Sequence, residues 1–301
     1  MSMVFDESIP LDYDGLLDAT KNLKERYSFF QSFSIGKSFL GRQLIGFNLG
    51  GGKPDALYVG GVHALEYITS MVLLKFAAEL CECMQTGRML YGYDIKKLLG
   101  EHPIYIIPML NPDGVEIHLK GMQTAGTMKS LVRAIAGSDF SNWQANARGV
   151  DLNHNFNAGY ELLKTQEREN GILGPAVRQY GGPRAESEPE TRALCYLCRH
   201  LMFKKTIAFH SQGEEIYWNY GNNTPRSAQS TAKILAASCG YSVAEPEGMA
   251  SNGGFKDWFI KVFHRPGFTI ELGLGKNPLP VDDLASIYKK ITNMLLLGLF
   301  V

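Results

Sequence analysis

The stretch "ALYVGGVHALEYITS", residues 56–70, joins a short apolar run to two glycines, a histidine and the start of a helical pattern. The apolar run Ala56–Val59 favours a buried strand. From Glu66 onward, "EYITSMVLLKFAAELCECM" has the length and composition of a long helix. The pattern therefore places His63 and Glu66 close together, where a buried strand gives way to a helix.

Strands and helices alternate along most of the chain. This favours an α/β fold with a mostly parallel or mixed sheet and helices on both faces, in one domain spanning residues 1–301. Segment 138–183 is rich in Asn, Gly and Gln and predicts long surface loops. The motif "NPDG" at 111–114 predicts a turn, and Ser187 with Glu190 predicts a capping box. We expect strands at 29–36, 43–50, 56–62, 103–110, 205–211, 215–221 and 267–273, and helices at 11–28, 66–84, 129–137, 187–203, 225–240, 254–263 and 280–300.

The composition argues against several classes of function. Lys and Arg total 30, as do Asp and Glu, so no basic surplus indicates binding to nucleic acid or to a membrane surface. The longest apolar run, "MLLLGLF", is too short to cross a bilayer. The first residues are acidic and lack an apolar segment, so we expect no signal peptide and a cytoplasmic protein. The 5 cysteines have no framework spacing, which suggests reduced thiols.

Residue types that bind zinc follow the predicted strands. Catalytic zinc sites use three protein ligands drawn from His, Cys and carboxylate side chains. His63 and Glu66 are close enough to share one metal, and His210 ends another apolar strand, where ligands often gather in an α/β sheet. Glu271, near the end of a third strand, suits a general base for hydrolysis. Structural readings stay open: Glu66 as a helix cap beside a core histidine, and Glu271 as a salt-bridged strand end.

Four motifs, "HALE", "GVDLNHNF", "AFHSQG" and "FTIELG", occur in this order and together resemble the carboxypeptidase A-like zinc metallopeptidases. The resemblance extends from "SIGKSFLGRQL" to the last predicted helix. Within that family the chain is most similar to γ-D-glutamyl-meso-diaminopimelate peptidases, which cut peptidoglycan stem peptides; "YGGPRAESEPETRAL" and "HSQGEEIYWNYG" also resemble this subgroup. The resemblance implies a mixed eight-stranded sheet flanked by helices, in agreement with the alternating pattern.

The resemblance also implies the metal and the main catalytic residues. One zinc ion per chain would be held by His63, Glu66 and His210, and it would activate the attacking water. Glu271 would act as the base that moves a proton from that water to the leaving amine. The glycines before His63 would let the chain turn without a side chain that blocks the metal.

Two further residues receive roles by the same resemblance. Asp151 would orient His63, and Arg148 would polarise the scissile carbonyl and stabilise the oxyanion. Without the family, Asp151 could equally be a turn-capping residue and Arg148 a solvated surface residue.

The sequence departs from the family at three substrate-binding positions. Asn153 and His154 stand where digestive members have an Asn-Arg pair that grips the substrate's terminal carboxylate, so that grip should be weaker or directed at another group. Lys256 would line the side-chain pocket and favour a substrate carboxylate such as that of diaminopimelate, unless it points to solvent. Met249 occupies the place of a mobile family tyrosine.

The leading hypothesis is a zinc peptidase that hydrolyses the γ-D-Glu–meso-diaminopimelate bond of a stem peptide or muropeptide. A second hypothesis is a zinc carboxypeptidase that removes acidic or other C-terminal residues. A third, from another class, is a binding module that kept the fold and lost its chemistry. Loss of a metal ligand or of the base would indicate this third hypothesis. Here the three ligand positions and the base position all carry suitable residues.

Overall fold

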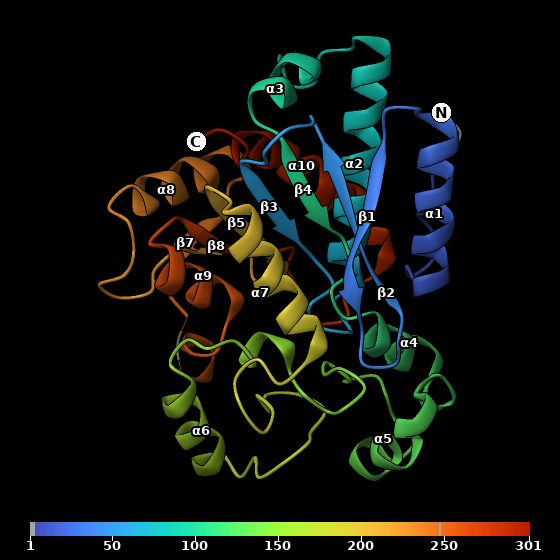
Figure 1. The fold of residues 1–301 in the computed structure, drawn as a ribbon, viewed down its shortest axis with the longest axis vertical. Coiled ribbons are helices and arrows are strands. Elements are labelled where there is room, and N and C mark those ends of the chain that lie inside the picture. The colour runs from blue at the N-terminus through green and yellow to red at the C-terminus, as the bar shows by residue number, and fades with distance from the viewer. Residues whose placement is uncertain (1–3, 247) are drawn as a thin grey trace.

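Eight strands form one mixed sheet in the order β1-β2-β4-β3-β5-β8-β6-β7 (Figure 1). The computed structural model describes residues 4–246 and 248–301. Residues 1–3, which belong to the acidic N-terminal segment discussed above, lie outside the described part. This sheet confirms the predicted α/β class. The strands are β1 (Gln31–Lys37), β2 (Gln43–Leu49), β3 (Ala56–Val59), β4 (Ile104–Ile107), β5 (Lys205–His210), β6 (Glu215–Tyr217), β7 (Ser242–Ala244) and β8 (Gly267–Glu271).

Ten α-helices are present in the described part of the chain, together with short 3-10 turns. Most of them come from segments with the expected helical periodicity. The helices are α1 (Tyr13–Arg26), α2 (Tyr67–Thr86), α3 (Ile95–Glu101), α4 (Pro112–Lys120), α5 (Lys129–Ala136), α6 (Tyr160–Glu169), α7 (Pro189–Leu201), α8 (Ala228–Cys239), α9 (Phe255–Phe263) and α10 (Leu284–Leu297), and the 3-10 turns are η1 (Met122–Thr124), η2 (Gly126–Met128), η3 (Leu152–His154), η4 (Gly248–Ser251) and η5 (Val281–Asp283).

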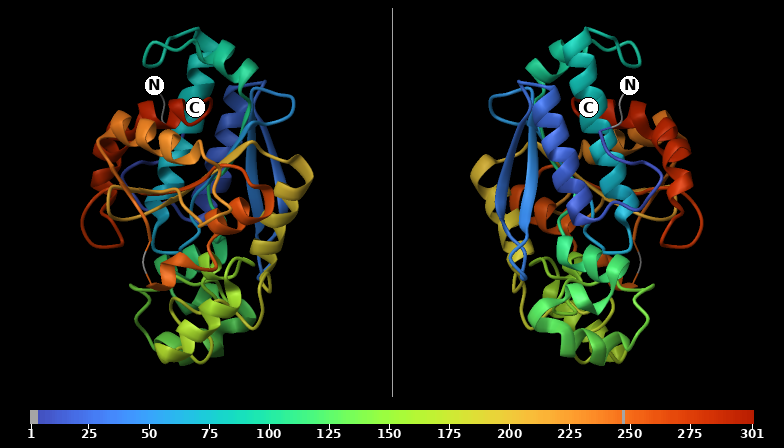
Figure 2. Two further views of the ribbon diagram at one scale, coloured as in Figure 1. Left: turned by 90° about the vertical axis from the view of Figure 1, so that its left-hand side faces the viewer. Right: turned by 90° about the vertical axis from the view of Figure 1, so that its right-hand side faces the viewer.

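The sheet is a central layer with helices on both faces (Figures 1 and 2). Successive side chains of a strand point to opposite faces, and β3 shows this directly. Ala56 and Tyr58 join a core cluster that contains residues of α1, α2, α8 and α10. Leu57 and Val59 join a second cluster, formed with α7 and α9. A strand buried on both faces explains why all four of its residues are apolar.

Strands β3, β5 and β8 run parallel and side by side, so their carboxyl ends meet at one edge of the sheet. The register pairs His210 at the end of β5 with Glu271 at the end of β8. Helices α4, α5 and α6, with the loops between them, lie at this end of the molecule (Figure 1). The candidate site residues that end or follow these strands are therefore brought to a common place by topology.

The turn after β3 depends on close packing of its glycines. A Cβ on Gly61 would lie 2.5 Å from Ser70 Oγ and 2.9 Å from Met109 Cα, and the residue has a φ of +56°. The Gly61 amide donates to Thr69 Oγ1 at 2.8 Å, which ties the turn to the first turn of α2. These contacts show that the glycine is needed because the turn packs against α2 and the loop after β4; the expected role in leaving space for a metal stays a prediction.

Several elements differ from the sequence-based expectations. Helices α3, α4 and α6 and strand β7 were not predicted, and α6 lies inside the segment expected to be loops. The "NPDG" motif starts helix α4: Asn111 accepts a hydrogen bond from the Gly114 amide at 3.0 Å, and Pro112 occupies the first helical turn. The same residue types serve a turn or a helix start, and only the residues that follow decide which.

The predicted capping box at Ser187 is also wrong. Helix α7 begins at Pro189 with Glu188 as N-cap, and the Ser187 hydroxyl donates to Glu188 Oε1 at 2.7 Å. Glu190 instead accepts the Phe39 amide at 2.9 Å, from the turn between β1 and β2. The buried polar contacts of this region therefore outweigh the local capping pattern.

The five cysteines are free and buried, as expected for reduced thiols. Cys195 and Cys198 lie on α7 in the core, so this C-x-x-C is not a metal site. Within the described residues, no helix has the length and apolar character needed to cross a membrane.

Glu190 is a buried acid with an incomplete set of partners. Its Oε2 atom has no hydrogen-bond partner among the described residues. Burial, together with the negative charges of Asp113 and Glu188, raises the pKa of Glu190 to about 8. Between pH 4.5, the ordinary pKa of a glutamate in the unfolded chain, and about pH 8, Glu190 keeps its proton in the folded protein and loses it in the unfolded chain. Stability must therefore fall as the pH rises through this window.

We expect Glu190→Gln to remove this pH dependence, because a glutamine cannot ionise. The variant should match the parent near pH 4.5 and exceed its free energy of unfolding by about 4 kcal/mol at pH 8. Urea unfolding at both pH values measures the difference, with Glu101→Gln, an exposed residue at the end of α3, as the control. Equal slopes against pH for Glu190→Gln and the parent would contradict the assignment.

Candidate metal centre

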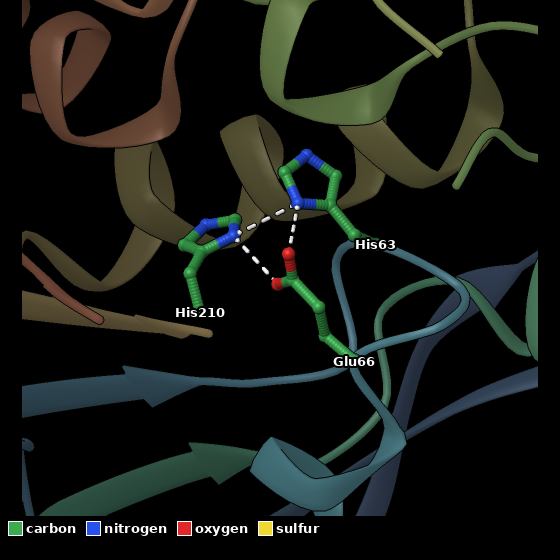
Figure 3. Close-up of side chains that lie close together, drawn as sticks. All are labelled: His63, Glu66 and His210. Carbon is green, nitrogen blue, oxygen red and sulfur yellow. Dashed lines mark hydrogen bonds and ion pairs between the residues drawn. The ribbon is translucent and has the colours of Figure 1, made fainter. Parts of the chain in front are cut away.

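His63, Glu66 and His210 converge at the carboxyl edge of the sheet (Figure 3). All three are buried, and one ligand atom from each lies within 4.8 Å of the others. Glu66 Oε1 is 2.9 Å from His63 Nδ1, Glu66 Oε2 is 3.0 Å from His210 Nδ1, and the two Nδ1 atoms are 3.1 Å apart. The predicted grouping of these residues is therefore present in the structure.

Asp151 fixes the orientation of His63 from the other side of the ring. His63 Nε2 lies 3.1 Å from Asp151 Oδ1, so a proton on Nε2 can be donated to this carboxylate. Nδ1 then carries a lone pair that faces Glu66 and His210. Two ring nitrogens and a carboxylate that face one another form a donor set that zinc prefers, and the residues fit that ion.

The charged groups of the cluster shift one another's pKa values. Although burial opposes it, the negative charges of Glu66 and Asp151 raise the pKa of His63 well above its ordinary value. Burial also opposes ionisation of Glu66, but the positive charges of His63 and His210 lower its pKa. The cluster thus concentrates negative charge around the two rings, and a bound cation would take over the stabilising role of the protons.

Glu66 does not cap helix α2. It occupies the N-cap position, yet its side chain makes no capping hydrogen bond. Its backbone carbonyl accepts from the Thr69 amide at 3.0 Å and from the Thr69 hydroxyl at 2.8 Å, which frees the carboxylate to face the histidines. This contradicts the alternative reading of Glu66 as a capping residue.

Glu271 is placed beside the cluster by the β5–β8 register. It pairs with His210, and the Leu272 amide donates to the His210 carbonyl at 2.8 Å. Burial and the negative charge of Glu66 raise the pKa of Glu271 well above its ordinary value. Within the described residues it forms no ion pair, so the alternative of a salt-bridged strand end is not supported.

Asn153 and His154 follow Asp151 on η3 and contact the loops around it. The Asn153 amide donates to Asp151 Oδ1 at 3.0 Å, and its side-chain oxygen accepts from the Phe255 amide at 3.1 Å. His154 Nδ1 lies 3.1 Å from the Gln179 carbonyl oxygen. Both residues therefore link the metal centre to α9 and the loop before α7, and their substrate contacts stay a prediction.

Lys256 is buried at the start of α9, with 4% of its surface exposed. This contradicts the alternative of a lysine that points to solvent. Its ammonium group donates to the Asn219 carbonyl at 2.7 Å and contacts the Asp257 carboxylate. The positive charge of Lys256 is thus balanced within the chain by Asp257.

Arg148 has contacts that differ from those expected of an oxyanion-binding residue. Its Nη1 atom lies 3.3 Å from Oε1 of buried Glu188, and its guanidinium lies 5.1 Å from the centre of the Phe39 ring. A cavity opens beside Glu66, and Arg148 is not among the residues that line it. These contacts hold the guanidinium at Glu188, so the predicted role of Arg148 gains no support from its position.

A family model described as "Zinc carboxypeptidase" matches residues 16–293. The chain belongs to the zinc carboxypeptidase family. It is therefore a zinc-dependent peptidase, and the His63–Glu66–His210 cluster is its candidate zinc site. This is the outcome predicted from the motifs, and the intact His63–Glu66–His210 cluster argues against the hypothesis of a binding module.

Individual relatives show the same family and fold. Gamma-D-glutamyl-L-diamino acid endopeptidase 1 of Lysinibacillus sphaericus is 33% identical over 292 residues, which cover 96% of this chain and 72% of that protein. The solved structure of thrombin activatable fibrinolysis inhibitor has a TM-score of 0.74 at 19% identity, covering 97% of this chain and 74% of its own. Murein-tripeptide amidase MpaA from Escherichia coli O157 has a TM-score of 0.54 at 22% identity, covering 88% and 91%. At these identities the two structures show the fold alone.

Sequence reasoning missed the residues that line the cavity beside Glu66. These include Gln144, Arg178, Lys276 and Asn277. Asn277 lies next to the candidate metal centre, since its side-chain nitrogen is 3.5 Å from Glu66 Oε1. None of them stands in a strand or in a motif quoted for the family. Their only signal in the sequence was the polar character of segments 138–183 and 273–277.

Met249, expected at the position of the family's mobile tyrosine, lies in η4. One tyrosine lies on β6, beside the strand that carries Glu271: the Tyr217 hydroxyl donates to Glu215 Oε2 at 2.7 Å. Glu215 pairs with Glu271 across β6 and β8.

Asp151→Asn should weaken zinc binding about 10–100-fold, because an asparagine lacks the charge that orients and polarises His63. Competition with a chelator measures the affinity, and zinc content at saturation should stay at one ion per chain. Asp139→Asn is the matched control, since Asp139 is exposed and its carboxylate accepts from the Ser141 amide of its own turn. An unchanged zinc affinity in Asp151→Asn would show that Asp151 is a turn residue only.

Proposed function

We propose that this zinc peptidase hydrolyses the γ-D-Glu–meso-diaminopimelate bond of peptidoglycan stem peptides or muropeptides. The observation that carries the reaction type is the convergence of His63, Glu66 and His210 beside Glu271. The similarity to an endopeptidase named for the γ-D-glutamyl-L-diamino acid bond, over 96% of this chain, supports the substrate.

Each residue of the centre has a distinct task in this proposal. Zinc, when bound, supplies a Lewis acid for the scissile carbonyl and lowers the pKa of water. Glu271 accepts the proton of the attacking water and delivers it to the leaving amine, a task that suits a carboxylate with a raised pKa. Asp151 holds the His63 ring in place through Nε2. Asn153 and His154 contact the substrate on the α9 side of the centre.

The Lys256–Asp257 pair favours a zwitterionic substrate side chain over a purely acidic one. Both residues are buried, with 4% and 1% of their surfaces exposed, and their charges balance. The distal end of diaminopimelate carries an ammonium and a carboxylate group, so a pair with both signs of charge is complementary to it. A balanced pair offers no net attraction to an acidic C-terminal residue, which weighs against the carboxypeptidase alternative.

Hydrolysis of L-Ala-γ-D-Glu-meso-diaminopimelate tests the function directly. We expect the zinc-loaded protein to release diaminopimelate, and Glu271→Gln to lower kcat about 10²–10⁴-fold, because the proton acceptor is removed. Chelator treatment should abolish the activity, and zinc should restore it. Release of the amine product, followed by chromatography, is the measurement.

Glu101→Gln serves as the control for Glu271→Gln, since Glu101 is exposed on α3. Full zinc content with no cleavage of this bond would reject the substrate and leave the metal centre in place. Equal rates for Glu271→Gln and the parent would reject Glu271 as the base.

Lys256→Met should lower kcat/KM for the diaminopimelate substrate about tenfold, because a charge-assisted contact to the distal carboxylate is lost. The corresponding L-lysine peptide lacks that carboxylate, so its kcat/KM should change little. Lys261→Met, on the exposed side of the same helix, is the matched control.

A thermal melt of Lys256→Met shows whether the unpaired Asp257 has destabilised the fold. Lys256→Arg keeps the charge and should retain more of the preference for diaminopimelate. If Lys256→Met lowered kcat/KM equally for the diaminopimelate peptide and the L-lysine peptide, a role of Lys256 in side-chain recognition would be contradicted.

A further inference from the structure

A cavity of about 380 Å³ opens beside Glu66, and among the described residues its lining includes none from α9. Its wall includes Gln144, Arg178, Lys276 and Asn277. It shares no residue with the group formed by Asn153, His154 and Lys256. The volume falls in the range of small-molecule sites, so the cavity can hold one residue of a substrate.

The cavity wall carries positive charge that is not balanced locally. Arg178 and Lys276 are exposed, and within the described residues neither forms an ion pair or a side-chain hydrogen bond. Among the described residues that line the cavity, Glu66 is the single acid, and its two oxygens face His63 and His210. The remaining polar lining residues are neutral amides and a serine, which are able to donate hydrogen bonds.

Backbone contacts fix the two cationic loops relative to the metal centre. The Ala64 amide donates to the Gln144 carbonyl at 3.0 Å, and the Gln144 amide donates to the Val177 carbonyl at 2.9 Å. The Gln179 amide donates to Asp151 Oδ2 at 2.9 Å. Arg178 therefore lies between two residues that are both anchored to the loops of the metal ligands.

The position of Lys276 is fixed through its neighbour. The Ser211 hydroxyl donates to Asn277 Oδ1 at 2.8 Å, and the Asn277 amide nitrogen also lies 3.5 Å from Glu66 Oε1. Lys276 is thus one residue from a side chain that contacts a ligand of the metal. Two cations held on anchored loops form a site for an anion close to the reacting carbonyl.

A γ-linked glutamyl residue places an anion where an ordinary peptide has none. Its side-chain carboxyl forms the amide bond, so its α-carboxylate is free and lies on the acyl side of the scissile bond. An arginine offers a planar fork of donors that matches a carboxylate.

We propose that Arg178 and Lys276 bind the free α-carboxylate of the γ-linked glutamyl residue and so select γ-linked over α-linked substrates. This inference rests on the proposed function, and it assigns the acyl half of the substrate to the cavity. The amine half then lies toward Lys256 and α9. Gln144 and Asn277 supply neutral donors on either side of the same carboxylate.

The test compares L-Ala-γ-D-Glu-meso-diaminopimelate with the analogue whose glutamyl α-carboxylate is amidated. We expect the parent protein to cleave the carboxylate form with a kcat/KM at least about tenfold higher. Arg178→Gln and Lys276→Gln should each reduce that advantage, and the double variant should remove it with little change on the amidated peptide. Arg184→Gln, an exposed arginine outside this cavity, and Lys289→Gln are matched controls.

Binding provides a second readout that does not need turnover. In the Glu271→Gln background, calorimetry with the intact peptide should show about tenfold weaker binding after Arg178→Gln, and no such change for the amidated peptide. Equal binding of both peptides before and after the substitution would overturn the inference.

The outcomes also separate this inference from the proposed function. Cleavage of both peptides at equal rates, unaffected by the two substitutions, overturns the anion site and leaves the function standing. Cleavage of neither peptide by the zinc-loaded parent rejects the function itself.

Discussion

The mutual approach of two imidazole nitrogens and a carboxylate is the constraint on which the rest of this structure depends. His63 Nδ1 and His210 Nδ1 lie 3.1 Å apart, and each faces an oxygen of Glu66. Buried lone pairs and negative charge repel at such distances unless a proton or a cation lies among them. The loops around the cluster hold this arrangement, and zinc is the cation after which the zinc carboxypeptidase family is named.

The sheet provides the rigidity that such a centre requires. His210 and Glu271 end adjacent parallel strands, so their spacing is set by the ladder of backbone hydrogen bonds. His63 and Glu66 stand on a turn locked by Gly61 and Thr69. The proposed ligands and the proposed base therefore sit on strand ends and a fixed turn, where their side chains are held in place by rigid elements.

The sequence allowed the buried strands and the ligand set to be predicted, because both leave local signals. Short apolar runs followed by His63, His210 and Glu271 identify strand ends directly. The partners of Arg148 and Lys256 could not be predicted in this way. Each pairs with a carboxylate, Glu188 or Asp257, and which charges meet in a buried region depends on tertiary packing that local patterns do not contain.

Charge is distributed unequally around the metal centre, and this asymmetry connects the fold to the proposed substrate. At α9 the charge of Lys256 is cancelled by Asp257, whereas in the cavity beside Glu66 Arg178 and Lys276 have no acidic partner among the described residues. A γ-glutamyl-diaminopimelate substrate has a matching arrangement, with a free α-carboxylate on the acyl side and a side chain with a zwitterionic end on the amine side. An α-linked peptide with an acidic end would present its charge to the neutral side instead, so the electrostatics favour the γ-linked substrate.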